Sequence, residues 1–167
     1  MNPNTRYALA GLQAGTSGAL GLLTWMSLQA RFFGKSLWWV PNLLASIFYG
    51  ESSIKNGFGR YTMAGFAALL LLYALLGVLF GLLWRDRPKG SRLLLAGWGV
   101  GILAYYGVIR WTLPEFSPIG ALYVPNHQFL FAHLIFGTLL ARYTRFRDRL
   151  LPTVATTPEG TAADPAL

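Results

Sequence analysis

The segment Thr62–Trp84, TMAGFAALLLLYALLGVLFGLLW, constrains the fold of this chain more than any other part of the sequence. It contains no charged residue and no proline, and leucine recurs at nearly every second or third position. As an α-helix the segment would be roughly 34 Å long, enough to cross a hydrocarbon layer of about 30 Å. Because lipid cannot hydrogen-bond to the backbone, a segment that crosses it has to be helical. The sequence therefore predicts an integral membrane protein.

The composition supports this interpretation and excludes several classes of function. Of the 167 residues, 54% are hydrophobic and 12% are charged, whereas a soluble domain carries about 25% charged residues. The net charge of +8 comes from cations that flank apolar segments, where they would meet lipid headgroups. We therefore expect the lipid bilayer, and no nucleic acid, as a partner. The absence of cysteine excludes disulfides, thiol chemistry and cysteine-ligated iron–sulfur centres.

We predict an all-α integral membrane protein that forms a four-transmembrane-helix bundle in one domain, residues 1–151. The predicted spans are residues 8–28, 62–84, 93–113 and 125–143. The basic turn 85–92 is short, so it predicts that the helices on either side of it are antiparallel neighbours. Residues 152–167 are rich in Pro, Thr and Ala and are expected to form a disordered tail.

A shorter apolar segment, residues 37–49, lies between the first two spans. It is too short to cross a bilayer, and Trp38 and Trp39 favour the headgroup boundary. Pro41 suits the first turn of a helix and Gly50 suits its C-terminal end. We therefore predict a short interfacial helix here.

The distribution of cations predicts the orientation of the bundle. One side carries Arg6, Arg85, Arg87, Lys89, Arg92, Arg142, Arg145, Arg147 and Arg149, and the other carries Arg31, Lys35, Lys55, Arg60 and Arg110. Because the side richer in cations faces the cytoplasm, we expect a protein of the inner or plasma membrane with both termini on the cytoplasmic side.

Small residues four positions apart recur in all four predicted spans. The pairs are Gly11/Gly15, Gly77/Gly81, Gly97/Gly101 and Gly137/Ala141. In lipid such pairs allow close helix packing. Two interpretations follow: packing within this bundle, or docking of other subunits or of a second copy of the chain.

The first span also carries a stripe of polar residues at helical spacing. Its members are Gln13, Thr16, Ser17, Thr24 and Ser27, while Leu12, Ala19, Leu22 and Met26 are expected to face lipid. Such a stripe either hydrogen-bonds to neighbouring helices or lines a path for water or a ligand.

His133 is the single residue most suggestive of chemistry. It lies inside the fourth span, one turn before Gly137, which would leave space beside its ring. One interpretation is a neutral histidine bonded to a polar side chain such as Gln13 or Ser17. The alternatives are proton handling and ligation of a haem iron or a chlorophyll-type magnesium. The sequence predicts no other metal or cofactor.

Polar residues on the predicted outer side form a second candidate site. Val-Pro-Asn occurs at residues 40–42 and 124–126, either as a relic of duplication or as two similar helix starts. If the copies are related, one pocket would gather Asn42, Asn126, His127, Arg110 and Glu115, with Glu51 nearby. Arg110 is alternatively a cation that snorkels from the end of its helix.

We find no catalytic motif and expect that the protein is not an enzyme. Three functional hypotheses follow. Trp38–Gly50 and Ala132–Gly137 resemble segments of uncharacterised bacterial four-helix membrane proteins, a resemblance that implies no function. The first hypothesis is a non-catalytic accessory or structural subunit of a larger membrane complex. The second is a haem- or chlorophyll-type pigment-binding protein that uses His133. The third is a carrier or binder of a small apolar or lipid-like molecule.

Overall fold

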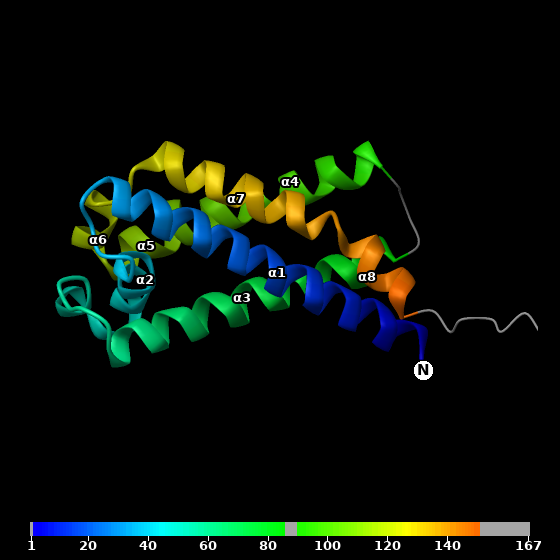
Figure 1. Cartoon of the computed structure of the whole chain (residues 1–167), viewed down its shortest axis with the longest axis horizontal. Helices are drawn as coiled ribbons and strands as arrows, with labels where there is room; N and C mark the ends of the chain where they lie inside the picture. The colour runs from blue at the N-terminus through cyan, green and yellow to red at the C-terminus, as the bar shows by residue number, and fades with distance from the viewer. Residues whose placement is uncertain (1, 86–89, 151–167) are drawn as a thin grey trace, which may run out of the picture.

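The computed structural model describes residues 2–85 and 90–150, and all the regular structure in this part of the chain is helical. The long helices run side by side (Figure 1): α1 (Pro3–Phe32), α3 (Arg60–Trp84), α4 (Ser91–Tyr105) and α7 (Asn126–Leu140). The shorter elements are α2 (Trp39–Tyr49), the 3-10 helix η1 (Glu51–Ser53), the π-helix η2 (Tyr106–Thr112), α5 (Leu113–Phe116), α6 (Pro118–Leu122) and α8 (Tyr143–Arg149). The predicted all-α class is confirmed. The predicted tail 152–167 and the cations Arg87 and Lys89 lie outside the described residues.

Two of the described helical segments are long and apolar enough to cross a membrane. They are α3 and the continuous segment Ser91–Phe116, made of α4, η2 and α5. Their most apolar windows are only 28% and 33% buried, whereas the core helix of a soluble protein is mostly buried. α1 is long but carries the polar stripe, and the 15 residues of α7 extend only about 22 Å. These findings support membrane association, and they do not confirm four spans.

The short elements α2, α5 and α6 gather at one end of the bundle, and the N-terminus and α8 lie at the other (Figure 1). The predicted helix at residues 37–49 is present as α2, with Pro41 in its first turn. The chain leaves α2 at Gly50, whose φ of 72° favours glycine. Most of α2 is buried against α3, so it belongs to the core at this end of the bundle.

The predicted helix at residues 125–143 is wrong at its C-terminal end, because α7 stops at Leu140. A turn leads into α8, where the hydroxyl of the buried Tyr143 lies 3.3 and 3.2 Å from the carbonyl oxygens of Gly81 and Arg85, which share its single proton. Arg147, only 6% exposed, donates to the same Arg85 carbonyl at 3.1 Å. Carbonyls at a helix C-terminus need such donors. Arg147 therefore caps α3, and the prediction that it meets headgroups is wrong.

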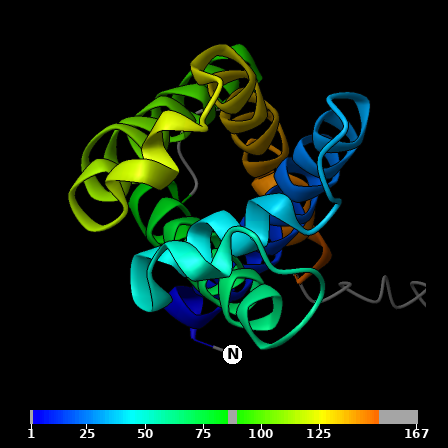
Figure 2. The same ribbon diagram turned by 90° about the vertical axis from the view of Figure 1, so that its left-hand side faces the viewer.

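Glycine contacts hold the long helices together in the order α3, α1, α7, α4 around the bundle (Figure 2). A Cβ atom at Gly11 or Gly77 would collide with the carbonyl oxygen of the other residue, across the α1–α3 contact. Gly97 and Gly137 are related in the same way across the α4–α7 contact. The small-residue pairs predicted from the sequence are therefore used within this chain.

α3 and α4 run antiparallel, as predicted from the short turn between them (Figure 1), yet they are not a packed pair. The packed pairs of long helices in the described chain are α1 with α3, α1 with α7, and α4 with α7. Between α3 and α4 lies an elongated cavity. The predicted antiparallel direction is confirmed, but the two helices face each other across the cavity without close packing, because each is held by a glycine contact to a different central helix.

We predict that Gly77→Ala destabilises the bundle by about 1–3 kcal/mol, because the added methyl group pushes α1 away from α3. The measurement is thermal unfolding of the detergent-solubilised protein followed by circular dichroism. Gly99→Ala is the control: no atom lies within 4 Å of a Cβ at Gly99, and alanine favours helix. Equal melting temperatures for the two variants would contradict the role assigned to the glycine contact.

Candidate functional site

The first candidate site is the cavity between α3 and α4, which we call the α3–α4 groove. It has a volume of about 930 Å³ and follows α3 from Ala68 to Trp84. This length corresponds to about 24 Å of helix, most of the thickness of a hydrocarbon layer. Its opposite wall is formed by α4, η2 and α5, and α2 closes one end with Leu44, Ile47 and Phe48.

The lining of the groove is almost entirely hydrocarbon. Representative side chains are Leu72, Leu76, Leu79 and Leu83 from α3 and Leu103 and Trp111 from the other wall. Leu103 is 71% exposed and Trp111 73% exposed, values that would be unfavourable in water over so long a surface. In a bilayer the same side chains meet acyl chains at no such cost.

Hydroxyl groups line the groove at Tyr73 and Thr112, and both already have partners. Thr112 donates to the carbonyl of Gly107 at 2.7 Å, a bond that spans five residues as in a π-helix. The Tyr73 hydroxyl lies 2.6 Å from Nε2 of His133. A ligand in the groove would therefore be recognised by its shape and its apolar surface, because both hydroxyls are already bonded.

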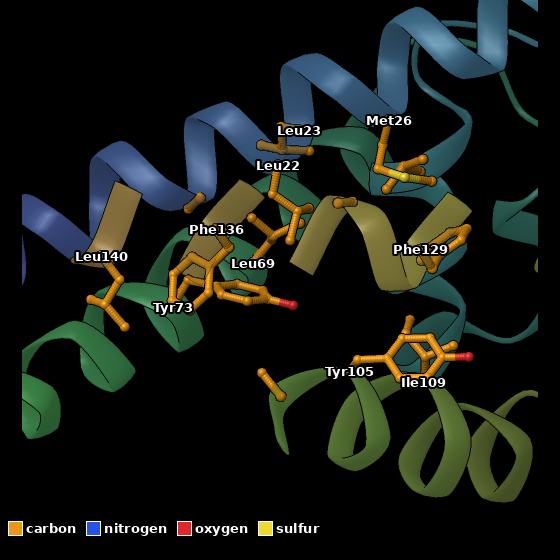
Figure 3. Packing of buried hydrophobic residues seen from close by; sticks show 14 of the residues in the cluster. Leu22, Leu23, Met26, Leu69, Tyr73, Tyr105, Ile109, Phe129, Phe136 and Leu140 are labelled. Carbon is orange, nitrogen blue, oxygen red and sulfur yellow. The ribbon is translucent and has the colours of Figure 1, made fainter. Parts of the chain in front are cut away.

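The His133 cluster, formed by Tyr73, Tyr105, His133 and Phe136, connects three of the long helices behind the groove. Figure 3 shows Tyr73 reaching from α3 to lie beside Phe136 of α7, with their ring centroids 4.7 Å apart. Tyr105 of α4 packs edge-on against the imidazole at 5.6 Å. His133 itself is 1% exposed. Aromatic contacts of this kind fix the relative positions of α3, α4 and α7.

The partners of His133 define its tautomer. Nδ1 lies 2.7 Å from the carbonyl oxygen of Phe129, which can only accept, so Nδ1 carries the proton. Nε2 is then an acceptor and takes the hydrogen bond of the Tyr73 hydroxyl. The expected partners Gln13 and Ser17 are replaced by a tyrosine from another helix. The space expected beside Gly137 is filled by the backbone of Gly97.

The polar stripe of α1 is exposed or half-buried along its length, and Ser27 donates to the carbonyl of Leu37 in the following loop. Gln13 and Thr24 are exposed, and Thr16 and Ser17 are half-buried. Ser17 donates to the carbonyl of Ala14 and Thr24 to that of Leu20, so both hydroxyls are satisfied by their own helix.

The expectation that Ala19, Leu22 and Met26 face lipid is wrong, because all three are buried. The close approach of Gly11 and Gly15 to α3 sets the rotation of α1 and turns these residues inwards.

The predicted outer cluster is not assembled. Asn42 is 0% exposed, donates to the carbonyls of Asn56 and Gly57 at 2.6 and 3.3 Å, and accepts from Thr62 at 2.7 Å. Asn126 is instead exposed at the start of α7, 3.4 Å from the hydroxyl of Tyr105. The two Val-Pro-Asn copies thus occupy different helical positions.

The other members of the predicted outer cluster, Arg110, Glu115 and His127, are exposed, and Glu51 is half-buried. No hydrogen bond in the described chain joins any two of the predicted members. His127 does line a second, smaller cavity near Lys35.

Comparison with protein-family models, with curated proteins and with solved structures finds no match. The described residues also contain no group of three or more His, Asp or Glu side chains placed to hold a metal ion. Sequence reasoning missed Tyr73 and Tyr105 as partners of His133. A signal existed for Tyr73, since it is the only hydroxyl in the apolar segment after Thr62, and a hydroxyl in hydrocarbon needs a partner.

We predict that Tyr73→Phe destabilises the protein by about 1–3 kcal/mol, because it leaves Nε2 of His133 buried without a donor. The measurement is a double-mutant cycle of Tyr73→Phe and His133→Leu on thermal or denaturant unfolding in detergent. A coupling energy well above about 0.5 kcal/mol is expected. Tyr106→Phe, on the neighbouring exposed ring, is the control and should be neutral. Additive effects of the paired substitutions would contradict the assigned bond.

Proposed function

We propose that this protein is a non-catalytic membrane protein that binds the hydrocarbon chain of a lipid-like molecule in the α3–α4 groove. The observation that carries the proposal is the groove itself. Its volume of about 930 Å³ falls at the upper end of the range of about 300–1,000 Å³ found for small-molecule sites. It is long and apolar, and neither hydroxyl in its lining is free to select a polar ligand. A flexible hydrocarbon chain fits these properties.

The topology that we propose is four crossings of the cell membrane, the inner or plasma membrane, with both termini in the cytoplasm. Two facts support it. α1 packs between α3 and α7 along the bundle, and α7 packs against α4, so α1 and α7 share the depth of the two apolar segments. The end that carries the N-terminus and α8 (Figure 1) holds the segments with Arg6, Arg85, Arg92, Arg142, Arg145, Arg147 and Arg149, more cations than the described segments of the other end. The polar stripe of α1 lowers its hydropathy without adding a charge.

An accessory or structural subunit of a larger membrane complex is the second candidate. The small-residue pairs that suggested docking are occupied within this chain, and the groove is one open apolar surface that could receive a partner helix. The groove is open along its length, so a partner helix could lie against it without being enclosed. Its volume lies within the range found for small-molecule sites, which is why we place the chain-like ligand first.

Ligation of haem or a chlorophyll-type pigment by His133 is the third candidate. The proton on Nδ1 is bound by a backbone carbonyl, an arrangement common in metal-ligating histidines. Nε2 is however occupied by the Tyr73 hydroxyl, which would have to move for a metal to bind. An absorption spectrum of protein purified from its native membrane tests this candidate, and a visible band lost in His133→Leu would favour it over the lipid-like ligand.

We predict that Gly107→Leu releases a ligand that the wild-type protein retains through purification. Gly107 lines the groove and no atom lies within 4 Å of a Cβ there, so the leucine side chain enters the groove without disturbing a helix contact. The measurement is native mass spectrometry of protein extracted from native membranes in mild detergent. We expect the fraction with bound lipid to fall about tenfold, the effect of roughly 1.4 kcal/mol.

Gly99→Leu is the matched control for this experiment. A Cβ atom at Gly99, on the same helical segment, would also have no atom within 4 Å, but Gly99 does not line the groove. It should retain the ligand like the wild type. Loss of ligand from both variants, or a wild-type protein that carries no lipid, would count against the proposed function. A stoichiometric polypeptide in place of lipid would favour the subunit hypothesis.

A further inference from the structure

A second cavity lies on the α1–α7 side of the bundle, at the end that carries α2. We call it the Lys35 pocket; its volume is about 450 Å³, and its lining includes Met26, Phe33, Lys35, Trp39, His127 and Gln128. The C-terminal part of α1, the loop that follows it, and the first turn of α7 each contribute one side. Nothing in the proposed function uses this cavity.

The Lys35 ammonium is held in a defined place inside this pocket. Its Nζ atom lies 3.7 Å from the ring centroid of Trp39 and 3.4 Å from the carbonyl oxygen of Tyr123. Trp39 is buried and packs edge-on against Phe129, so the ring is a fixed platform for the cation. An ammonium group carries three donors, and the Tyr123 carbonyl uses one of them.

The charge of Lys35 has no acidic partner in the described part of the chain. No carboxylate there lies within ion-pair distance of it, and none lines the pocket. Partial burial lowers the pKa of the Lys35 ammonium below its ordinary value, which expresses the cost of removing this charge from water. A partly buried cation without a counter-ion is stabilised by an anion that enters beside it.

Further donors converge on the same space. Gln128 is half-buried and His127 exposed, and the side chain of neither has a hydrogen-bond partner within residues 2–85 and 90–150. The positive end of the α7 dipole acts in the same direction, because the first turn of this 15-residue helix has no acidic residue and no side-chain cap. The pocket thus presents several donors without an acidic acceptor.

We propose that the Lys35 pocket binds a phosphate-class oxyanion, with the Lys35 ammonium as the main contact and Gln128 and His127 as additional donors. Met26 and Phe33 add an apolar wall, which suits a phosphate attached to an organic group. The phosphate of an anionic lipid headgroup and free inorganic phosphate share the chemistry that these donors recognise. The site lies apart from the α3–α4 groove and does not depend on its occupant.

The experiment measures binding of phosphatidylglycerol to purified full-length protein in detergent micelles, by native mass spectrometry with a lipid titration. We expect Lys35→Met to weaken binding about tenfold or more, since a hydrogen-bonded ion contact of this kind is lost while an unbranched apolar side chain remains. Gln128→Ala should weaken it by a smaller factor. Lys55→Met is the matched control, because Lys55 is an exposed lysine that does not line the pocket, and it should bind like the wild type.

A second arm of the titration separates the two sources of phosphate. Inorganic phosphate at millimolar concentration should displace the lipid if the bare ion occupies the pocket, and should fail to do so if the apolar wall also contributes; both results support an oxyanion site. Equal lipid binding by Lys35→Met, Lys55→Met and the wild type would overturn the proposal. Melting curves of the variants check that each is folded, and Lys35→Arg, which keeps the charge, should retain binding.

Discussion

Direct contact between helix backbones at glycine is the interaction on which the rest of this structure depends. In the bilayer placement that we propose, no hydrophobic force acts between helices, so close packing and hydrogen bonds have to hold them together. Gly11 with Gly77 and Gly97 with Gly137 create two tight pairs, α1 with α3 and α4 with α7. Larger side chains on α7 then pack into the surface of α1, where Phe136 covers Gly18. Three sides of the bundle are closed in this way.

The fourth side stays apart because α3 and α4 offer each other leucine instead of glycine. α3 uses its glycines against α1, and α4 uses Gly97 and Gly101 against α7. The faces that remain carry long side chains such as Leu72 and Leu103, which line the groove. The connection between α3 and α4 is short, yet it fixes only their antiparallel direction. The groove is therefore a consequence of where the glycines are placed along the two helices.

Local signals in the sequence predicted single elements well, and contacts between elements less well. The apolar segment 62–84 coincides with α3, and Pro41 and Gly50 mark the two ends of α2, because these signals act within a few residues. The rotation of α1 was predicted wrongly for Ala19, Leu22 and Met26, which are buried, because the approach of Gly11 to α3 involves contacts that the sequence of one helix does not reveal. The pairing of His133 with Tyr73 joins residues far apart in the chain, and spacing along one helix cannot reveal it.

The need to satisfy polar groups in an apolar surrounding explains how polarity is distributed over the molecule. Along the helices, Thr24 and Thr138 donate their hydroxyl protons to carbonyls of their own helix, and the Tyr73 hydroxyl bonds to the buried His133. A ligand that runs along the bundle therefore meets hydrocarbon and few free donors. Chemical selectivity has to come from the ends of the helices, where loops bring unlike residues together and water can solvate a charge. Lys35 occupies such a position, and this is why the proposed oxyanion site at the end of the bundle is compatible with an apolar groove along its side.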